Sequence, residues 1–197
     1  MFSMPEASIS VRQARLADAD AIARIHVASW RATYAGIIGA ATLAGLSVDE
    51  RAAGWRKRLA SLEQGTAPHP YTCFVAVDSS NAVVGFANGG ATRPMASGAL
   101  PQPYDGELYA IYLEPGTTRR GTGARLVHAV ASQLAAEGIR SLVIWALAAN
   151  PCRGFYEALG GAPVFQQDVT IGAQTLPEVG FGWPDIHTLI MRTASRA

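Results

Sequence analysis

The stretch 115–126 carries the residue types that most directly suggest chemistry. It reads PGTTRRGTGARL and joins a strand-like run to a helix-like run. Backbone N–H groups at a helix start have no partner within the helix, and the helix dipole favours an anion there. Gly121 and Gly123 let the backbone come close to a ligand, while Arg119 and Arg120 supply charge and forked donors. The stretch therefore predicts a phosphate-binding turn.

The same turn is also compatible with an ordinary connection between a strand and a helix. It lacks the pattern G-x-x-x-x-G-K-[ST] of P-loop nucleotidases. The dinucleotide fingerprint G-x-G-x-x-G is incomplete as well, because position 126 is Leu. Which interpretation holds depends on the elements that surround the turn.

Hydrophobic periodicity divides the chain into alternating strands and helices. Strands are predicted over 9–14, 71–77, 82–89, 107–114, 141–147, 164–171 and 174–183, and helices over 18–34, 40–46, 49–63, 121–137 and 150–159. The succession of strand, helix and strand from 107 to 147 predicts a parallel pair with a right-handed crossover. We therefore expect an α+β fold, with a mixed, mostly antiparallel sheet, one central parallel crossover and helices on both faces. One domain over 9–192 is expected to follow a loose tail over 1–8.

Composition excludes several classes of protein. The chain is 49% hydrophobic and 16% charged, which is typical of a protein with a real core. A net charge of +1 gives no basis for bulk binding of nucleic acid. Cys73 and Cys152 lack the spacing of metal ligands, so no metal site is expected. We expect no signal peptide and no membrane span, and a cytoplasmic location; a homodimer is compatible with the sequence.

Two motifs resemble those of the GCN5-related N-acetyltransferase (GNAT) superfamily. The run from Leu113-Glu114-Pro115 into Arg119-Arg120-Gly121-Thr122-Gly123-Ala124 resembles the family's pyrophosphate loop, [QR]-x-x-G-x-[GA]. The run from Asn150 to Gly161 resembles its Asn…Phe-Tyr-Glu-x-x-Gly helix. The order of elements matches along nearly the whole chain. One departure is Thr118, which stands where the family usually has Gln or Arg.

The resemblance implies a V-shaped opening between the strands 107–114 and 141–147, into which the pantetheine arm of acetyl-CoA inserts. The residues implied to bind acetyl-CoA (coenzyme A) are Ile111, Tyr112, Leu113, Arg119, Arg120, Gly121, Thr122, Gly123, Ala124, Asn150 and Tyr156. The Leu113 N–H is implied to polarise the thioester carbonyl. Asn150 is expected to bond the pantetheine arm, to cap the following helix, or to do both.

Two residues are implied to act in catalysis. Tyr156 lies where the family places the tyrosine that protonates the leaving thiolate, although an aromatic there also fits simple core packing. Glu107 begins its strand and, by period-two alternation, is predicted to share a face with Tyr109, Ile111 and Leu113. A glutamate at this separation serves as the base in histone-type members. Glu107 fits an ordinary strand-edge carboxylate equally well.

The acceptor side is expected at the end of the first helix. Trp30, Arg31 and Tyr34 are the candidate substrate residues there, and Trp30 and Tyr34 are neighbours on one helix face. Packing of two aromatic rings would explain the same pair. The function expected is transfer of an acetyl group to a primary amine of a small molecule. An N-terminal acetyltransferase acting on proteins or peptides and a non-catalytic sensor of acyl-CoA remain the alternatives.

Overall fold

The computed structural model describes residues 9–99, 101–117 and 121–194. Its strands are β1 (Ser10–Gln13), β2 (Tyr71–Val77), β3 (Val83–Ala91), β4 (Gly106–Leu113), β5 (Leu142–Leu147), β6 (Ala162–Ile171) and β7 (Gln174–Trp183). Its helices are the 3-10 turn η1 (Leu16–Asp18), α1 (Ala19–Thr33), α2 (Ala40–Ala44), α3 (Val48–Glu63), α4 (Thr122–Ala136), α5 (Arg153–Ala158) and α6 (Ile186–Ala194). The tail expected over 1–8 lies outside the described residues. None of the described helices has the length and apolar character needed to cross a membrane.

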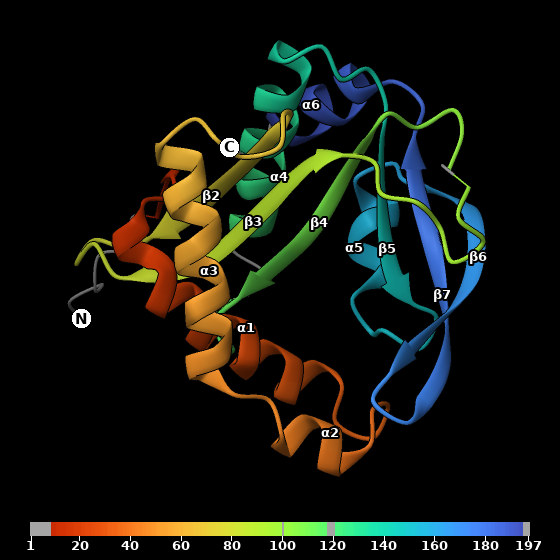
Figure 1. The fold of residues 1–197 in the computed structure, drawn as a ribbon. Coiled ribbons are helices and arrows are strands. Elements are labelled where there is room, and N and C mark those ends of the chain that lie inside the picture. Colours follow the sequence, from red (N-terminus) through yellow and green to blue (C-terminus); the bar gives the residue numbers. More distant parts are fainter. Residues whose placement is uncertain (1–8, 100, 118–120, 195–197) are drawn as a thin grey trace, which may run out of the picture.

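All seven strands form one sheet in the order β1-β2-β3-β4-β5-β7-β6. β4 and β5 are parallel, with α4 as their crossover, and every other neighbouring pair is antiparallel. The α+β class, the mixed sheet and the single central crossover expected from the sequence are therefore confirmed (Figure 1).

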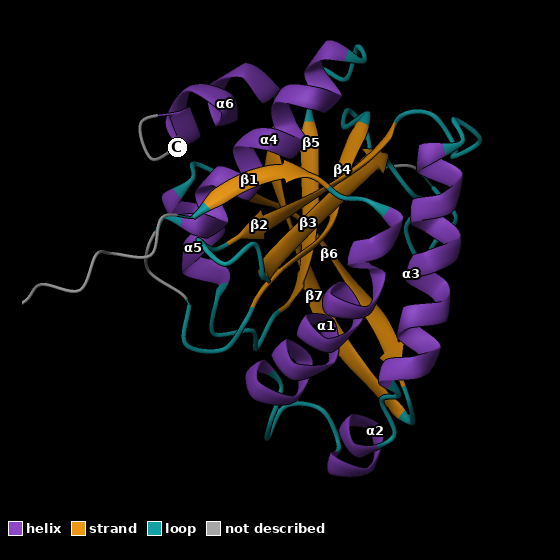
Figure 2. Cartoon of the chain, turned by 90° about the vertical axis from the view of Figure 1, so that its left-hand side faces the viewer, coloured by secondary structure: helices purple, strands orange, loops and turns teal. Residues whose placement is uncertain are grey.

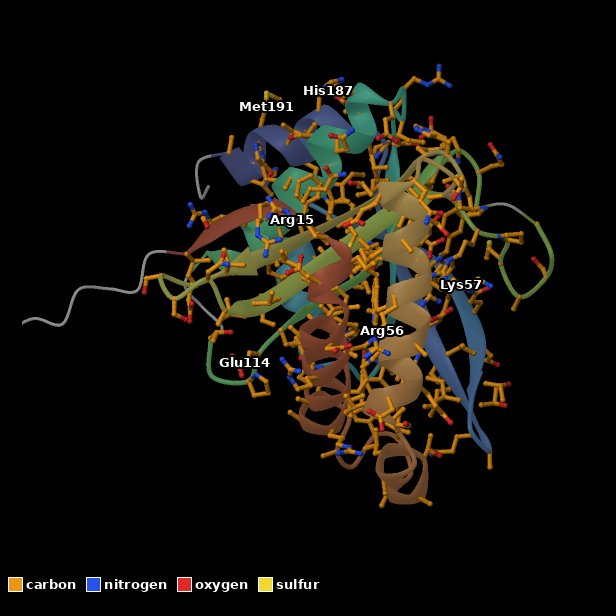
Figure 3. All side chains as sticks on the ribbon, turned by 60° about the vertical axis from the view of Figure 1, so that its left-hand side comes forward. Arg15, Arg56, Lys57, Glu114, His187 and Met191 are labelled. Carbon is orange, nitrogen blue, oxygen red and sulfur yellow. The ribbon has the colours of Figure 1, made fainter. Side chains whose placement is uncertain are left out.

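Helices cover both faces of the sheet (Figure 2). On one face, α4, α5 and α6 close an apolar cluster whose fully buried members include Leu126, Leu134 and Leu189. On the other face, α1 and α3 pack against β2 and β3, with Trp55 and Leu59 buried beneath α3. The exposed face of α3 is polar, and Arg56 and Lys57 point away from the sheet in Figure 3.

The C-terminal helix α6 was not predicted from the sequence. It buries Ile186, Leu189 and Thr193, and it packs against α4. Thr193, in the last turn, turns its hydroxyl back to the Leu189 carbonyl at 2.8 Å. Its buried residues recur at intervals of three and four, so the sequence did carry a helical pattern here.

A β-bulge in β4 decides which way its side chains point. Asn88 pairs with Ala110 but Gly89 pairs with Leu108, so Tyr109 is an extra residue in the strand. The predicted common face of Glu107, Tyr109, Ile111 and Leu113 is therefore wrong. Leu108 joins Ile111 and Leu113 on the α4 face, which puts its neighbour Glu107 on the opposite face. The physical reason is that one inserted residue shifts the period-two alternation.

We predict that the bulge region tolerates no added side chain at Gly89. A Cβ there would lie 2.7 Å from the Glu107 carbonyl oxygen and 3.0 Å from Val130 Cγ1. Gly89→Ala should lower the free energy of unfolding by about 1–3 kcal/mol, measured by urea denaturation.

Gly54, inside α3, is the matched control. A Cβ there meets only the mobile end of Arg58, at 3.2 Å. Gly54→Ala should raise stability by about 0.5–1 kcal/mol, because alanine is the better helix former. Equal effects of the two substitutions would contradict the steric argument at Gly89.

Candidate functional site

The candidate site is an opening between β4 and β5. These parallel strands pair only at Gly106 with Leu142 and at Glu107 with Val143. Beyond that point β4 stays paired with β3 up to Leu113, while β5 stays paired with β7 up to Leu147. The two strands thus separate toward their carboxyl ends, as the resemblance implied.

The pairing of β3 with β4 shows which backbone groups face this opening. The Glu114 N–H donates to the Val84 carbonyl at 2.8 Å, so these two residues form a hydrogen-bonded pair. Alternation along an antiparallel ladder then turns the N–H and C=O of Leu113 and Ile111 away from β3 and toward β5. The same rule turns those of Tyr112 toward β3, which differs from the pantetheine contact expected of its backbone.

Helix α1 fixes the end of β4. The Ser29 hydroxyl donates to the Leu113 carbonyl at 2.6 Å, and Ser29 is buried. The Trp30 indole donates to the Tyr112 hydroxyl at 2.9 Å. The Ser29 bond occupies the Leu113 carbonyl and leaves the Leu113 N–H as the group available at the opening, and the Trp30 bond fixes the side chain of Tyr112.

The N-terminus of α4 has the features of an anion site. Gly121 is its N-cap, with φ +77°, a left-handed conformation that favours glycine. The helical ladder begins with the Arg125 N–H donating to the Gly121 carbonyl, so the N–H groups of residues 122–124 precede it. The Thr122 hydroxyl oxygen is buried and has no hydrogen-bond partner in the described part of the chain. An orphaned polar atom at a helix N-terminus fits a phosphate group.

Two further residues that were expected to bind the cofactor have packing contacts instead. Gly123 packs against Phe155, since a Cβ there would lie 3.1 Å from its ring, and Ala124 is buried. Gly123 therefore lets α4 lie close to α5, and Ala124 belongs to the apolar cluster beneath α4. Thr118, Arg119 and Arg120 lie outside the described residues, so the role of the two arginines stays a prediction.

Tyr156 reaches the α4 side of the site from α5. Its side chain is buried beside Phe155 and Phe181, with ring centroids 5.4 and 5.7 Å away. Burial raises the pKa of Tyr156, and the nearby Tyr112 and Tyr34 raise it further. Among the described residues, none forms a hydrogen bond with its hydroxyl. Tyr156 thus has packing partners for its ring and none for its O–H.

Asn150 links α5 to α1. Its side-chain oxygen accepts from the Cys152 N–H at 2.8 Å, which is a turn before the helix and not the cap expected of it, because Cys152 is the N-cap of α5. Its amide nitrogen donates to the Tyr34 hydroxyl at 3.2 Å. Burial raises the pKa of Tyr34. Tyr34 is therefore bound to a residue just beyond the end of β5, and its expected role in binding the acceptor stays a prediction.

Glu107 is buried and bound to Arg93, which sequence analysis did not single out. The Arg93 backbone N–H donates to Glu107 Oε2 at 3.0 Å, and Arg93 Nε donates to Oε1 at 3.1 Å. Arg93 Nη2 also contacts Oε1. The guanidinium lies 4.6 Å from the centre of the Tyr109 ring, and the Glu107 hydrogen bond raises the pKa of Arg93. Both carboxylate oxygens are thus engaged by one residue.

The other expected acceptor residues divide into two groups. Arg31 donates to the carbonyls of Leu43, Ala44 and Leu46, the nearest at 2.9 Å, so its guanidinium holds the end of α2. Trp30 and Tyr34 pack edge to face, with centroids 5.2 Å apart. A cavity of about 540 Å³ lies beside the 35–40 turn and Gln174, and neither Tyr156 nor Glu107 lines it.

Glu178 on β7 is the second residue that sequence analysis missed. It pairs with Leu147 at the carboxyl end of β5, and its carboxylate accepts from the Gln167 amide at 2.7 Å. Burial raises the pKa of Glu178. A carboxylate in a long hairpin strand gives no signal until the pairing of β5 with β7 is known. The described residues bring together no cluster of metal-ligating side chains.

A family match and a similar known protein both relate this chain to acetyltransferases. Residues 83–169, from β3 to β6, match the family described as FR47-like protein. The chain is 38% identical over 181 residues to "Uncharacterized N-acetyltransferase YuaI" of Bacillus subtilis (strain 168), covering 92% of this chain and 96% of that protein.

Solved structures share the fold. The PaiA N-acetyltransferase of Thermoplasma acidophilum, in complex with coenzyme A, has a TM-score of 0.62 at 18% identity, covering 87% of this chain and 98% of that one. The YncA protein of Salmonella typhimurium, with acetyl-CoA, has a TM-score of 0.61 at 19% identity, covering 90% and 94%. These neighbours match the mixed sheet and its helices.

We predict that loss of Arg93 destabilises the fold, because it leaves the buried carboxylate of Glu107 without its partner. Arg93→Met should lower the free energy of unfolding by about 1–3 kcal/mol. Adding Glu107→Met should restore most of that loss, since replacing both partners removes the unpaired charge. Arg140→Met is the control, because its pair with Asp105 is exposed and should matter by less than about 1 kcal/mol. A double variant no more stable than Arg93→Met would contradict the pairing argument.

His26 generates a prediction about pH. It stacks on Tyr112 at 4.9 Å, and its Nδ1 atom is buried without a partner. Burial lowers the pKa of His26 from 6.5 to about 4, and the charges of Arg51 and Arg58 act in the same direction. Between these two pH values the unfolded chain binds more protons than the folded one, so stability falls as the pH falls through this window.

His26→Phe keeps an aromatic ring and removes this titration. As the pH is lowered through this window, the free energy of unfolding of the wild type should fall more steeply than that of the variant. The two slopes should differ by up to about 1.4 kcal/mol per pH unit. Urea denaturation at several values from pH 4 to 7.5 measures the difference. Parallel curves for the two proteins would show that His26 does not titrate in this way.

Proposed function

The chain belongs to the GCN5-related N-acetyltransferase superfamily and is an acetyltransferase of that type; from this premise we propose that it transfers the acetyl group of acetyl-CoA to a primary amine of a small molecule. The observation that supports this best is the opening between β4 and β5. Along it the backbone groups of Ile111 and the N–H of Leu113 turn away from β3, and in the proposal the hydroxyl of Tyr156, which has no hydrogen-bond partner among the described residues, acts beside them.

Acetyl-CoA fits the residues present. A pantetheine arm carries amide groups, and the free backbone groups along β4 can pair with them as a further strand would. The start of α4, with Thr122 and the Gly121 cap, would hold the pyrophosphate, and Arg119 and Arg120 would add charge. When bound, acetyl-CoA supplies an activated acetyl group on a thioester.

The chain's own groups then have separate tasks. The amine nitrogen forms a bond to the acetyl carbon, and the bond from that carbon to sulfur breaks. The Leu113 N–H would donate to the carbonyl oxygen as negative charge develops on it. The Tyr156 hydroxyl would hydrogen-bond the departing sulfur and give it a proton. An acceptor that arrives as an ammonium must first give one proton to a base, so that its nitrogen can attack. The nitrogen loses a second proton as the amide forms, and this proton replaces the one that Tyr156 gives to the sulfur.

The base role expected for Glu107 stays a prediction. Arg93 binds both oxygens of this carboxylate, so proton transfer to Glu107 requires the guanidinium to move or a water to replace one contact. What the contacts support directly is a positioning role. Glu107 anchors Arg93, and with it the start of the loop that leads from β3 to β4.

Two measurements test the proposal. Isothermal calorimetry should show binding of acetyl-CoA, and release of CoA thiol, followed with DTNB, should depend on an added amine. A protein that binds acetyl-CoA but releases CoA with no member of an amine panel would be a sensor. A protein that does not bind acetyl-CoA would remove the proposal altogether.

Tyr156→Phe gives the sharpest prediction for the chemical step. The substitution keeps the ring and its packing, so stability and acetyl-CoA affinity should change little. The single-turnover rate of acetyl transfer should fall by roughly 10–1,000-fold, because the thiolate loses its proton donor. Tyr104→Phe is the matched control, since Tyr104 is equally buried and packs against Phe165, away from the opening. A wild-type rate for the Tyr156 variant would make that residue a packing residue only.

A further inference from the structure

Glu178 is a half-buried carboxylate without an ion pair. Its only side-chain partner within the described ranges is the neutral amide of Gln167. None of the ion pairs among the described residues includes it. Removing a carboxylate from water without supplying a cation is costly, so a positive group placed here would gain the full benefit of the pairing.

The charges around Glu178 do not neutralise it. Two charged residues act on the pKa of Glu178. Glu107 raises it and Arg93 lowers it. Arg93 is already bound by Glu107 at contact distance. Two carboxylates thus share one guanidinium, which leaves one negative charge without a counter-ion.

Glu178 faces the acceptor side of the sheet. Leu147, its partner on β5, packs in the cluster that contains Tyr34, and cross-strand partners share a face. Burial raises the pKa of Tyr34, and the negative charge of Glu178 raises it further. Tyr34 in turn is bound to Asn150 beside the opening. The carboxylate therefore lies at the mouth of the site and on the face opposite α4.

Aromatic residues lie on β5 and β4, the next two strands after β7 across the sheet. Trp145 on β5 pairs with Gly180, where a Cβ would lie 3.3 Å from the indole, so the missing side chain makes room for the ring. Tyr109 lies on β4 beneath Arg93. Both rings are half-buried. Aromatic faces beside a carboxylate are the surroundings that bind ammonium groups.

The loop between β3 and β4 closes one side of this surface. It runs from β3 toward β6 in Figure 1, and the Ala96 N–H donates to the Gln167 side-chain oxygen at 2.7 Å. Gln167 therefore accepts from the loop and donates to Glu178 at once. This fixes the direction of the Gln167 amide and holds the Glu178 carboxylate in one orientation.

We propose that Glu178 binds an ammonium group of the acceptor, and that the acceptor is a diamine or polyamine in which a second nitrogen receives the acetyl group. This inference rests on the proposed acetyltransferase function. An amino acid acceptor is disfavoured, because its carboxylate would approach the unneutralised negative charge of Glu178 and Glu107. The guanidinium of Arg93 offers no free charge to offset that repulsion.

The test measures binding of 1,4-diaminobutane to the CoA-loaded protein by calorimetry. The wild type should bind the diamine, and Glu178→Gln should weaken binding at least tenfold, about 1.4 kcal/mol. Glutamine keeps the size of the side chain and an oxygen that can accept from Gln167. Asp168→Asn is the control, since it removes an exposed carboxylate from the adjacent position on β6 and should leave binding unchanged.

Steady-state kinetics supply the second readout. With 1,4-diaminobutane as acceptor, Glu178→Gln should raise KM at least tenfold and change kcat less, while glycine as acceptor should gain or stay unchanged. No diamine binding by the wild type, or equal binding by Glu178→Gln, would overturn the inference while acetyl-CoA binding still supports the proposed function. Failure of acetyl-CoA binding would instead defeat the function itself.

Discussion

The short contact between β4 and β5 is the constraint on which the site depends. A parallel pair at the centre of a sheet would normally satisfy its backbone groups along its length. Here the contact ends after Glu107, because β3 holds β4 and β7 holds β5 on diverging paths. Ser29 satisfies the Leu113 carbonyl, and the remaining groups face the opening. The fold therefore carries a row of hydrogen-bonding groups that a ligand can pair.

The bulge at Tyr109 sends the side chains of β4 to opposite faces of the sheet before and after it. Before it, the Glu107 side chain lies on the face of α1 and α3; after it, Ile111 and Leu113 turn their side chains to α4. Without the extra residue, Glu107 would share the face of Ile111 and bring a carboxylate into the apolar cluster under α4. The bulge thus separates the apolar face, where Tyr156 lies, from the charged face, where Arg93 and Glu178 lie.

Local patterns in the sequence predicted most elements and the central crossover, because apolar periodicity and glycine positions act over a few residues. They also predicted the helices in or beside which Asn150, Tyr156 and Tyr34 lie, while the roles of these three residues stay predictions. They failed where the outcome depends on pairing between distant strands. The bulge, the Arg93–Glu107 pair and Glu178 all arise from register across the sheet. The contacts of Arg31 were missed in a similar way, because its carbonyl partners lie at the end of α2 and just beyond it.

The surroundings of Tyr156 also constrain how it can act as an acid. A free phenol has a pKa near 10 and a thiol near 8.5, so a proton on tyrosine does not pass spontaneously to a thiolate in water (about 2 kcal/mol uphill). Burial raises the pKa of Tyr156, which keeps it protonated and ready but makes it a weaker acid. The same apolar walls act on a thiolate formed beside it, because burial disfavours every anion. Both pKa values rise together, so the difference between them stays small and the transfer stays feasible. The apolar packing by Phe155 and Phe181 is therefore compatible with the acid role, provided that sulfur and hydroxyl share it.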